Sequence, residues 1–234
     1  QFFRAMIKLG RWDELLSILD KSRLITMFHK DFSSYLTSDE HKNILTYVKY
    51  NLASKYAKDH ENIKAIELLE KVMTALPKFT LAYEMASNIF ISEKKYDNAI
   101  KIVKRAWKYK PTSNLCGIAI EAVKSVNEGQ VEKVYSSLKS IANMNSHDYE
   151  SNILLSLGAL ESERYDIASK HITEALSNEH KQRACILMAE YCQRTHGNKA
   201  EAIRWLRDAI KSQSDQTSED YFWDEDCFAI TPFI

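Results

Sequence analysis

The chain repeats itself over two consecutive blocks, TYVKYNLASKYAKDHENIKAIELLEKVMTALPKF at residues 46–79 and TLAYEMASNIFISEKKYDNAIKIVKRAWKYKPTS at residues 80–113. A shift of 34 positions superimposes three clear pairs: Pro77 on Pro111, Ala65 on Ala99, and Leu69 on Val103. Internal repeats of this period are typical of proteins that stack one helix pair on the next. The two blocks therefore predict a helical repeat array.

The same register continues downstream once a single inserted residue is allowed between Ala106 and Val134. Three apolar columns then run through five units. The first column is Ala65, Ala99, Val134, Ala168 and Ala202; the second is Leu69, Val103, Leu138, Ile172 and Leu206; the third is Val72, Ala106, Ile141, Ala175 and Ala209. Spacings of four and three residues place these positions on one side of a helix. Each second helix should therefore bury one apolar seam against its neighbours.

Composition points to the same fold class. The chain has 234 residues, of which 45% are hydrophobic and 27% charged, with only 5 Gly and 3 Pro. Sheet-rich folds need turn residues every few positions, whereas long helices need few. We expect an all-α solenoid of stacked antiparallel helix pairs, in which Pro77 and Pro111 end second helices because proline cannot continue a helix.

Three regions follow from the register. Residues 1–45 form a partial repeat with an insertion, in which GRWDELL at residues 10–16 looks like the start of a second helix. Thr37 and Glu40 fit a capping box that opens a long helix through Tyr56. Residues 46–211 form the array. Residues 212–234 form an acidic, aromatic tail, for which packing onto the last helix is favoured over a free ligand-like segment.

Charge and hydropathy limit the partners. The net charge is zero, but residues 1–111 carry 20 Lys and Arg against 13 Asp and Glu, and the remainder carries the opposite excess. This is not the continuous basic face of a nucleic-acid groove, and it either steers a charged protein or is only a solvated surface. No apolar run is long enough to span a membrane. Because the chain starts without Met inside an apolar-periodic stretch, we interpret it as part of a longer protein.

Catalytic, phosphate-binding and metal-binding motifs are missing from the sequence. The seven His never occur as an i, i+4 pair, and the four Cys lack metal-ligand spacing, so buried reduced thiols are expected. His29, His171, Met188 and Cys192 could in principle bind a haem, but no spacing places two of them across a pocket. The sequence therefore predicts no enzyme activity and no cofactor.

The small residue in each first helix, the alanine columns and the two prolines resemble the tetratricopeptide repeat. The match is good over residues 46–113 and looser over 114–211, and the usual first-helix Trp and Gly are replaced. In that family, first-helix positions 2, 5, 9, 12 and 13 line a protein-binding groove. Carried over by register, the predicted groove residues are Tyr47, Tyr50, Ser54, Lys58, Glu84, Asn88, Ser92, Arg183, Glu190 and Arg194.

A narrower resemblance lies in the last unit. LMAE at residues 187–190, Gly197, and AIRWL at residues 202–206 with a Trp-containing tail are similar to the C-terminal part of HemY proteins. That resemblance implies a bacterial inner-membrane protein whose anchor lies outside this sequence and whose repeat domain is expected in the cytoplasm. It also implies haem-biosynthesis enzymes as protein partners. A generic tetratricopeptide adaptor in assembly, secretion or chaperone work is the alternative.

Overall fold

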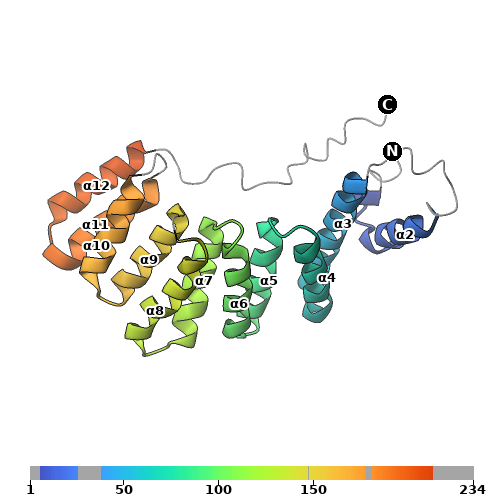
Figure 1. Ribbon diagram of the computed structural model, residues 1–234, viewed down its shortest axis with the longest axis horizontal. Helices are drawn as coiled ribbons and strands as arrows, with labels where there is room; N and C mark the ends of the chain where they lie inside the picture. The colour runs from blue at the N-terminus through green and yellow to red at the C-terminus, as the bar shows by residue number, and fades with distance from the viewer. Residues whose placement is uncertain (1–5, 26–37, 147, 178–180, 213–234) are drawn as a thin grey trace. The chain divides into compact units, whose positions relative to one another are not determined.

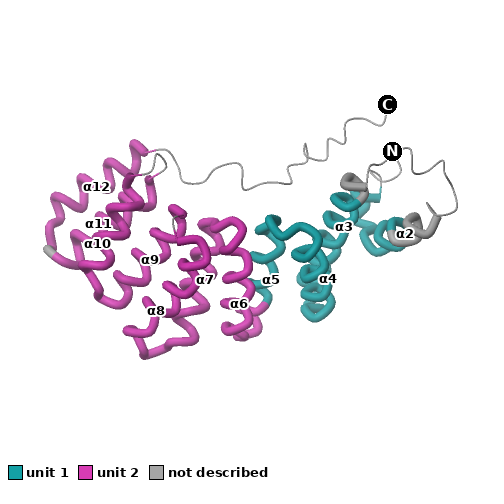
Figure 2. Tube along the Cα trace, viewed as in Figure 1, with its two compact units in different colours: residues 1–89 teal, residues 90–234 magenta. Residues whose placement is uncertain are grey.

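The computed structural model describes residues 6–25, 38–146, 148–177 and 181–212. It divides into two compact units, Gln1–Ile89 (unit 1) and Phe90–Ile234 (unit 2), shown in different colours in Figure 2. Within the described ranges every regular element is helical, which confirms the all-α class. Residues 213–234 of the predicted tail (212–234) lie outside the described residues, as does Thr37 of the proposed capping box.

Along the chain, first and second helices of successive pairs alternate, and Figure 1 labels them in order. The first helices of successive pairs are α3 (Ser38–Lys58), α5 (Thr80–Ser92), α7 (Ser113–Val126), α9 (Tyr149–Glu161) and α11 (Gln182–His196). The second helices are α2 (Trp12–Ile25), α4 (Asn62–Ala75), α6 (Tyr96–Trp107), α8 (Val131–Ala142), α10 (Tyr165–Leu176) and α12 (Lys199–Lys211). A short 3-10 turn, η1 (Asn143–Asn145), follows α8.

Unit 1 joins α2 to α3 and α3 to α4. Leu15 and Leu19 of α2 are buried with Val48 of α3. At the edge of this contact, Asp13 accepts hydrogen bonds from the Tyr56 hydroxyl at 2.9 Å and from Lys55 Nζ at 3.1 Å. The stretch that starts at Gly10 is therefore followed by a second-type helix, as its sequence predicted.

Unit 2 stacks consecutive helices from α6 to α12, and each helix packs on the next. The first helices α7 and α9, and then α9 and α11, also contact each other directly. This arrangement of sequential pairs is the predicted architecture. Among the described residues, no helix is long and apolar enough to cross a membrane.

The predicted seam forms the core of both units. Every residue of the three apolar columns is buried except one: Leu206 on α12 is 40% exposed. The small residues of the first column let first and second helices approach closely. Gly158 serves the same purpose on α9, because a Cβ built there would lie 2.7 Å from Leu138 Cδ1. The register therefore identified the core, and the exception marks the end of the described stack.

The turns inside each pair repeat as regularly as the helices do. Each of the five turns has one residue with positive φ at the same register position: His60, Lys94, Gly129, Glu163 and Gly197. In three of these turns the next residue donates its N–H to a carbonyl five residues earlier, as in Lys95 N to Phe90 O at 2.8 Å. This is the bonding pattern of a Schellman helix end, in which the left-handed residue is usually Gly. Three turns use other residues at a conformational cost.

Candidate functional site

The predicted groove residues lie on first helices of both units. Tyr47, Tyr50, Ser54, Lys58, Glu84 and Asn88 are in unit 1, and Ser92, Arg183, Glu190 and Arg194 are in unit 2. Their binding role stays a prediction. Their contacts with neighbouring side chains differ between the two units.

Tyr47 and Tyr50 of unit 1 pack against other aromatic side chains and are not freely exposed to solvent. The Tyr47 ring meets the Trp12 ring edge-on with centroids 5.8 Å apart, which ties α3 to α2. The Tyr50 ring meets Phe79 in the same way at 5.1 Å. Burial raises the pKa of Tyr50, and the negative charge of Glu84 raises it further. Edge-to-face pairs of this kind stabilise a fold, so removing either ring would alter unit 1 itself.

The remaining residues of unit 1 and its border vary in exposure. Lys58 and Asn88 are exposed, as is Ser92 at the start of unit 2, and Ser54 is half-buried. Glu84 is buried, with only 9% of its surface exposed. Its groove-lining role stays a prediction, but little of Glu84 is accessible to a partner, and its charge acts on Tyr50.

Arg183 of α11 forms a half-buried ion pair with Glu150 of α9. Its Nη1 lies 2.6 Å from both carboxylate oxygens, and the two side chains are 25% and 11% exposed. Burial alone lowers the pKa of Arg183, but Glu150 and the neighbouring Cys116 outweigh it and raise the pKa. Burial raises the pKa of the Cys116 thiol to about 12, so this thiol stays protonated at neutral pH. Arg183 is therefore a link between first helices.

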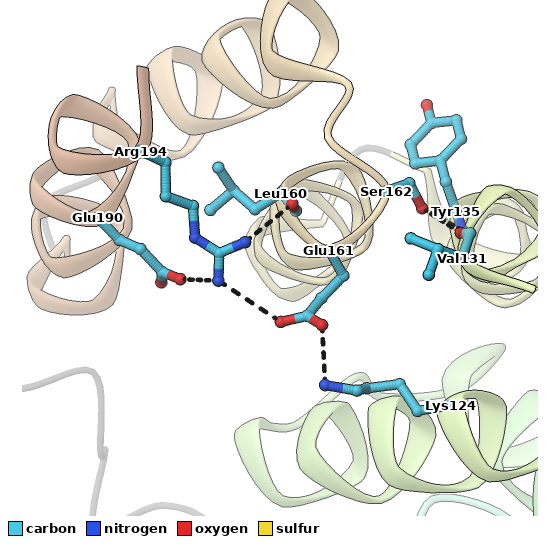
Figure 3. A network of polar contacts seen from close by, with 8 residues as sticks. All are labelled: Lys124, Val131, Tyr135, Leu160, Glu161, Ser162, Glu190 and Arg194. Atoms are coloured by element: carbon cyan, nitrogen blue, oxygen red, sulfur yellow. Dashed lines mark hydrogen bonds and ion pairs between the residues drawn. The ribbon is translucent and has the colours of Figure 1, made fainter. Parts of the chain in front are cut away.

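Arg194 of α11 belongs to a second network, drawn in Figure 3. Its guanidinium lies 2.5 Å from Glu190, 3.7 Å from Glu161 of α9, and 3.0 Å from the carbonyl oxygen of Leu160. The other oxygen of Glu161 is 2.8 Å from Lys124 Nζ on α7. These side chains are between one-third and one-half exposed. The network runs across three neighbouring first helices and remains open to solvent.

Apolar side chains lie at the same register positions of these helices. Val126, at position 12 of α7, is 42% exposed, and Leu157, at position 9 of α9, is half-buried. We use the name first-helix face for six residues: Lys124, Val126, Leu157, Glu161, Glu190 and Arg194. This face combines charges of both signs with apolar side chains, and such a mixture suits a polypeptide ligand.

The predicted groove contains only two of the six residues of the first-helix face, Glu190 and Arg194. Glu161 occupies position 13 of its unit, and Cys116 and Glu150 occupy position 2 of theirs, so the register already pointed to them. The repeat match is looser over residues 114–211, and the predicted groove includes no residue from 114–179. Lys124 falls outside the five positions, and only its contact with Glu161 reveals it.

In the described part of the chain, the residues named as able to bind haem already have contacts with other side chains. His171 Nδ1 lies 3.1 Å from Asn152 Oδ1, and burial lowers the pKa of this histidine. Cys192 is buried in a cluster with Ala189 and Ala202, against which Met188 and Trp205 pack. Cys116, Cys185 and Cys192 are buried free thiols, as predicted. Within the described ranges, no three His, Cys, Asp or Glu side chains are placed to hold a metal ion. His29 and Cys227 lie outside these ranges.

Comparison with known proteins finds similarity in structure only. No family model matches the sequence. No curated protein matches it. Among solved structures, MamA aligns with a TM-score of 0.42 and 16% identity over 68% of this chain and 92% of that chain. YrrB, described as a TPR protein with an unusual peptide-binding site, aligns with a TM-score of 0.42 and 16% identity over 72% of this chain and 87% of that chain. A MamA double mutant aligns with a TM-score of 0.43 and 12% identity over 73% of this chain and 97% of that chain.

At these values the likeness concerns the helix-pair fold and does not extend to function. The tetratricopeptide-like architecture of this chain rests on its own repeat register, helix boundaries and buried columns. The resemblance to HemY proteins finds no support in either sequence comparison.

Proposed function

We propose that this chain is a non-catalytic scaffold that binds another polypeptide on the first-helix face of unit 2. One observation carries the proposal: ion pairs join the three neighbouring first helices α7, α9 and α11 through side chains that stay one-third to one-half exposed, and Val126 on α7 is exposed as well. A surface held by its own cross-links loses little conformational entropy when a ligand binds. A generic adaptor role follows, and it is preferred over the haem-linked role.

The nature of the ligand follows from the residues of the face. Val126 and Leu157 offer apolar contact, and Lys124 and Glu190 offer charges of opposite sign near them. An amphipathic helix or extended segment that combines apolar anchors with mixed charges fits such a surface. Strongly acidic or strongly basic ligands would meet a like charge at one end or the other.

The test compares two valines of similar exposure. Val126 on the first-helix face is 42% exposed, and Val131 on α8 is 49% exposed. In a crosslinking pull-down from native extract, Val126→Arg should reduce recovery of the partner about ten-fold or more, since truncating or blocking a hot spot costs about 1–3 kcal/mol. Val131→Arg should leave recovery unchanged. Equal recovery of every partner with both variants would place the binding surface elsewhere.

Substituting the predicted groove residues Tyr47 and Tyr50 would be a poorer test of binding. Because Tyr47 and Tyr50 pack against Trp12 and Phe79, alanine substitutions there would change the stability of unit 1 as well as any binding. Val126→Arg avoids this difficulty because the side chain already faces solvent.

The haem-linked role is the narrower form of the same proposal. The short motifs around Gly197 and Trp205 are its basis, and it adds a haem-biosynthesis enzyme as the partner and a membrane anchor outside this sequence. The proteins recovered with wild type but lost with Val126→Arg decide between the two. If the recovered proteins include no tetrapyrrole-pathway enzyme, only the generic adaptor role remains.

A further inference from the structure

The last described helix exposes apolar side chains at positions that are better covered in the earlier units. Leu206 is 40% exposed, although the other four members of its column are fully buried. Ile210 is 81% exposed, whereas at the equivalent position Met73, Trp107 and Ala142 are at most 1% exposed and Leu176 is half-buried. We use the name terminal face for the exposed apolar residues Ile203, Leu206 and Ile210 of α12. They lie at i, i+3 and i+7 and share one side of the helix.

In the preceding units the following first helix covers this side. Leu138, which is equivalent to Leu206, lies directly against Gly158 of α9. The first helix α11 shows the same loss of cover. Ile186 is 44% exposed, whereas Ala119 and Ile153 at its register position are fully buried. The terminal face therefore has the form of a stacking surface whose next element is not among the described residues.

We propose that residues 213–234 of this chain cover the terminal face. The spacing agrees with this assignment. The next first helix starts seven or eight residues after the third column in unit 2, as from Ala175 to Gln182 and from Ile141 to Tyr149. The same interval from Ala209 reaches residues 216–217, just before the apolar residues Tyr221, Phe222, Trp223, Phe228 and Ile230.

Charge complementarity favours the same occupant. Exposed cations flank the terminal face on α12, namely Arg204, Arg207 and Lys211. Residues 213–234 contain six acidic residues and no Lys or Arg: Asp215, Glu219, Asp220, Asp224, Glu225 and Asp226. Apolar burial supplies most of the free energy of such a contact, and the opposite charges set its orientation. This surface is separate from the first-helix face, so the inference does not depend on the proposed function.

Hydrogen exchange of the full chain, followed by mass spectrometry, tests the proposal. Amides within 217–230 should exchange at least ten-fold more slowly than an unstructured peptide of the same sequence. Ile210→Ser should speed the exchange of these amides about ten-fold, toward the rate of the unstructured peptide, because it removes one apolar contact from the covered face. Ile63→Ser is the matched control, since Ile63 is 79% exposed on α4 and lies outside the terminal face.

A reciprocal variant in the tail tests whether the effect of Ile210→Ser comes only from a local change in α12. Phe222→Ser with Trp223→Ser should speed exchange of amides in 203–210 without changing exchange in α9. Sedimentation of the wild type should show that the protection exists in the monomer. Exchange of 217–230 at the unstructured rate would overturn the proposal. Protection that appears only with dimer formation would also overturn it, since the occupant would then be a second copy.

Discussion

Equivalent first-helix positions are held in different ways in the two units. In unit 1, position 2 is Tyr47, and its ring packs on Trp12 of the preceding helix. In unit 2 the same position is Cys116, Glu150 and Arg183, and the last two form an ion pair between neighbouring first helices. Both contacts join neighbouring helices at this position, one by aromatic packing and the other by a partly buried charge pair. The ionic version leaves more polar surface nearby, which is why unit 2 is the better candidate for binding.

The largest expected effect tests whether the two units share one design in their cores. Ala65→Asp in unit 1 and Ala168→Asp in unit 2 each place an unpaired charge at a fully buried alanine. Each should destabilise its own unit by about 4 kcal/mol or more. Peptide-resolved hydrogen exchange measures where protection is lost. Wild-type protection in either variant would show that its column is misassigned.

The next effect separates buried from exposed charge pairs on a single helix. Glu150→Ala leaves Arg183 half-buried without its carboxylate and should cost about 2–4 kcal/mol of stability in unit 2. Glu161→Ala, at the other end of α9, removes a more exposed carboxylate and should cost less than about 1 kcal/mol. Denaturant melts of both variants give the comparison. Adding Arg183→Met to Glu150→Leu should recover part of the loss, and equal costs for the two single variants would contradict the ranking.

A smaller effect tests the common turn. His60→Gly in unit 1 and Glu163→Gly in unit 2 place glycine at a left-handed position, with φ of 61° and 54°. Each should stabilise the protein by about 0.5–1 kcal/mol, since relief of the strain exceeds the entropy cost of glycine. Gly129→Ala is the reverse change and should destabilise by a similar amount. Thermal melts detect all three, and a loss of stability with both glycine variants would argue against this turn geometry.

The smallest effect is a pH dependence confined to unit 1. Burial alone raises the pKa of Asp13, but hydrogen bonds from Lys55 and Tyr56 outweigh it and lower the pKa below its usual value. This contribution to stability is present above about pH 4 and is lost as the pH falls through the lowered pKa. Asp13→Asn should therefore cost about 0.5 kcal/mol at pH 7, discounted for solvent exposure, and progressively less as the pH falls through the lowered pKa of Asp13. A cost that does not change with pH would exclude the ion pair as its source.

Much of the fold could be predicted because its signals are local. The columns that start at Ala65, Leu69 and Val72 depend only on the helical period, and all but Leu206 are buried as expected. Each second helix begins three residues before the first column, for example at Asn62 and Tyr165. Leu206 departs from the pattern because burial in a stack depends on the next element, and no next element is among the described residues.

The candidate site could be predicted only in part. Arg183 and Arg194 were expected to line a groove, which stays a prediction, and the register contains no information about which side chains pair with them. Glu84 was expected in the groove and is buried, because its exposure depends on how α3 and its neighbours pack. Lys124 belongs to the first-helix face through a contact with a residue 37 positions away.

The sequence alone determined the helices, their period and the residues of the seam, because helix propensity, apolar spacing and turn chemistry act over a few residues. Only the tertiary structure decided which charges became cross-links and which stayed exposed. Glu150 and Arg183 are 33 positions apart, and their atoms come within 2.6 Å only after α9 and α11 have stacked. Ion-pair geometry and burial depend on distances between helices, and those distances are set by the packing of the apolar columns.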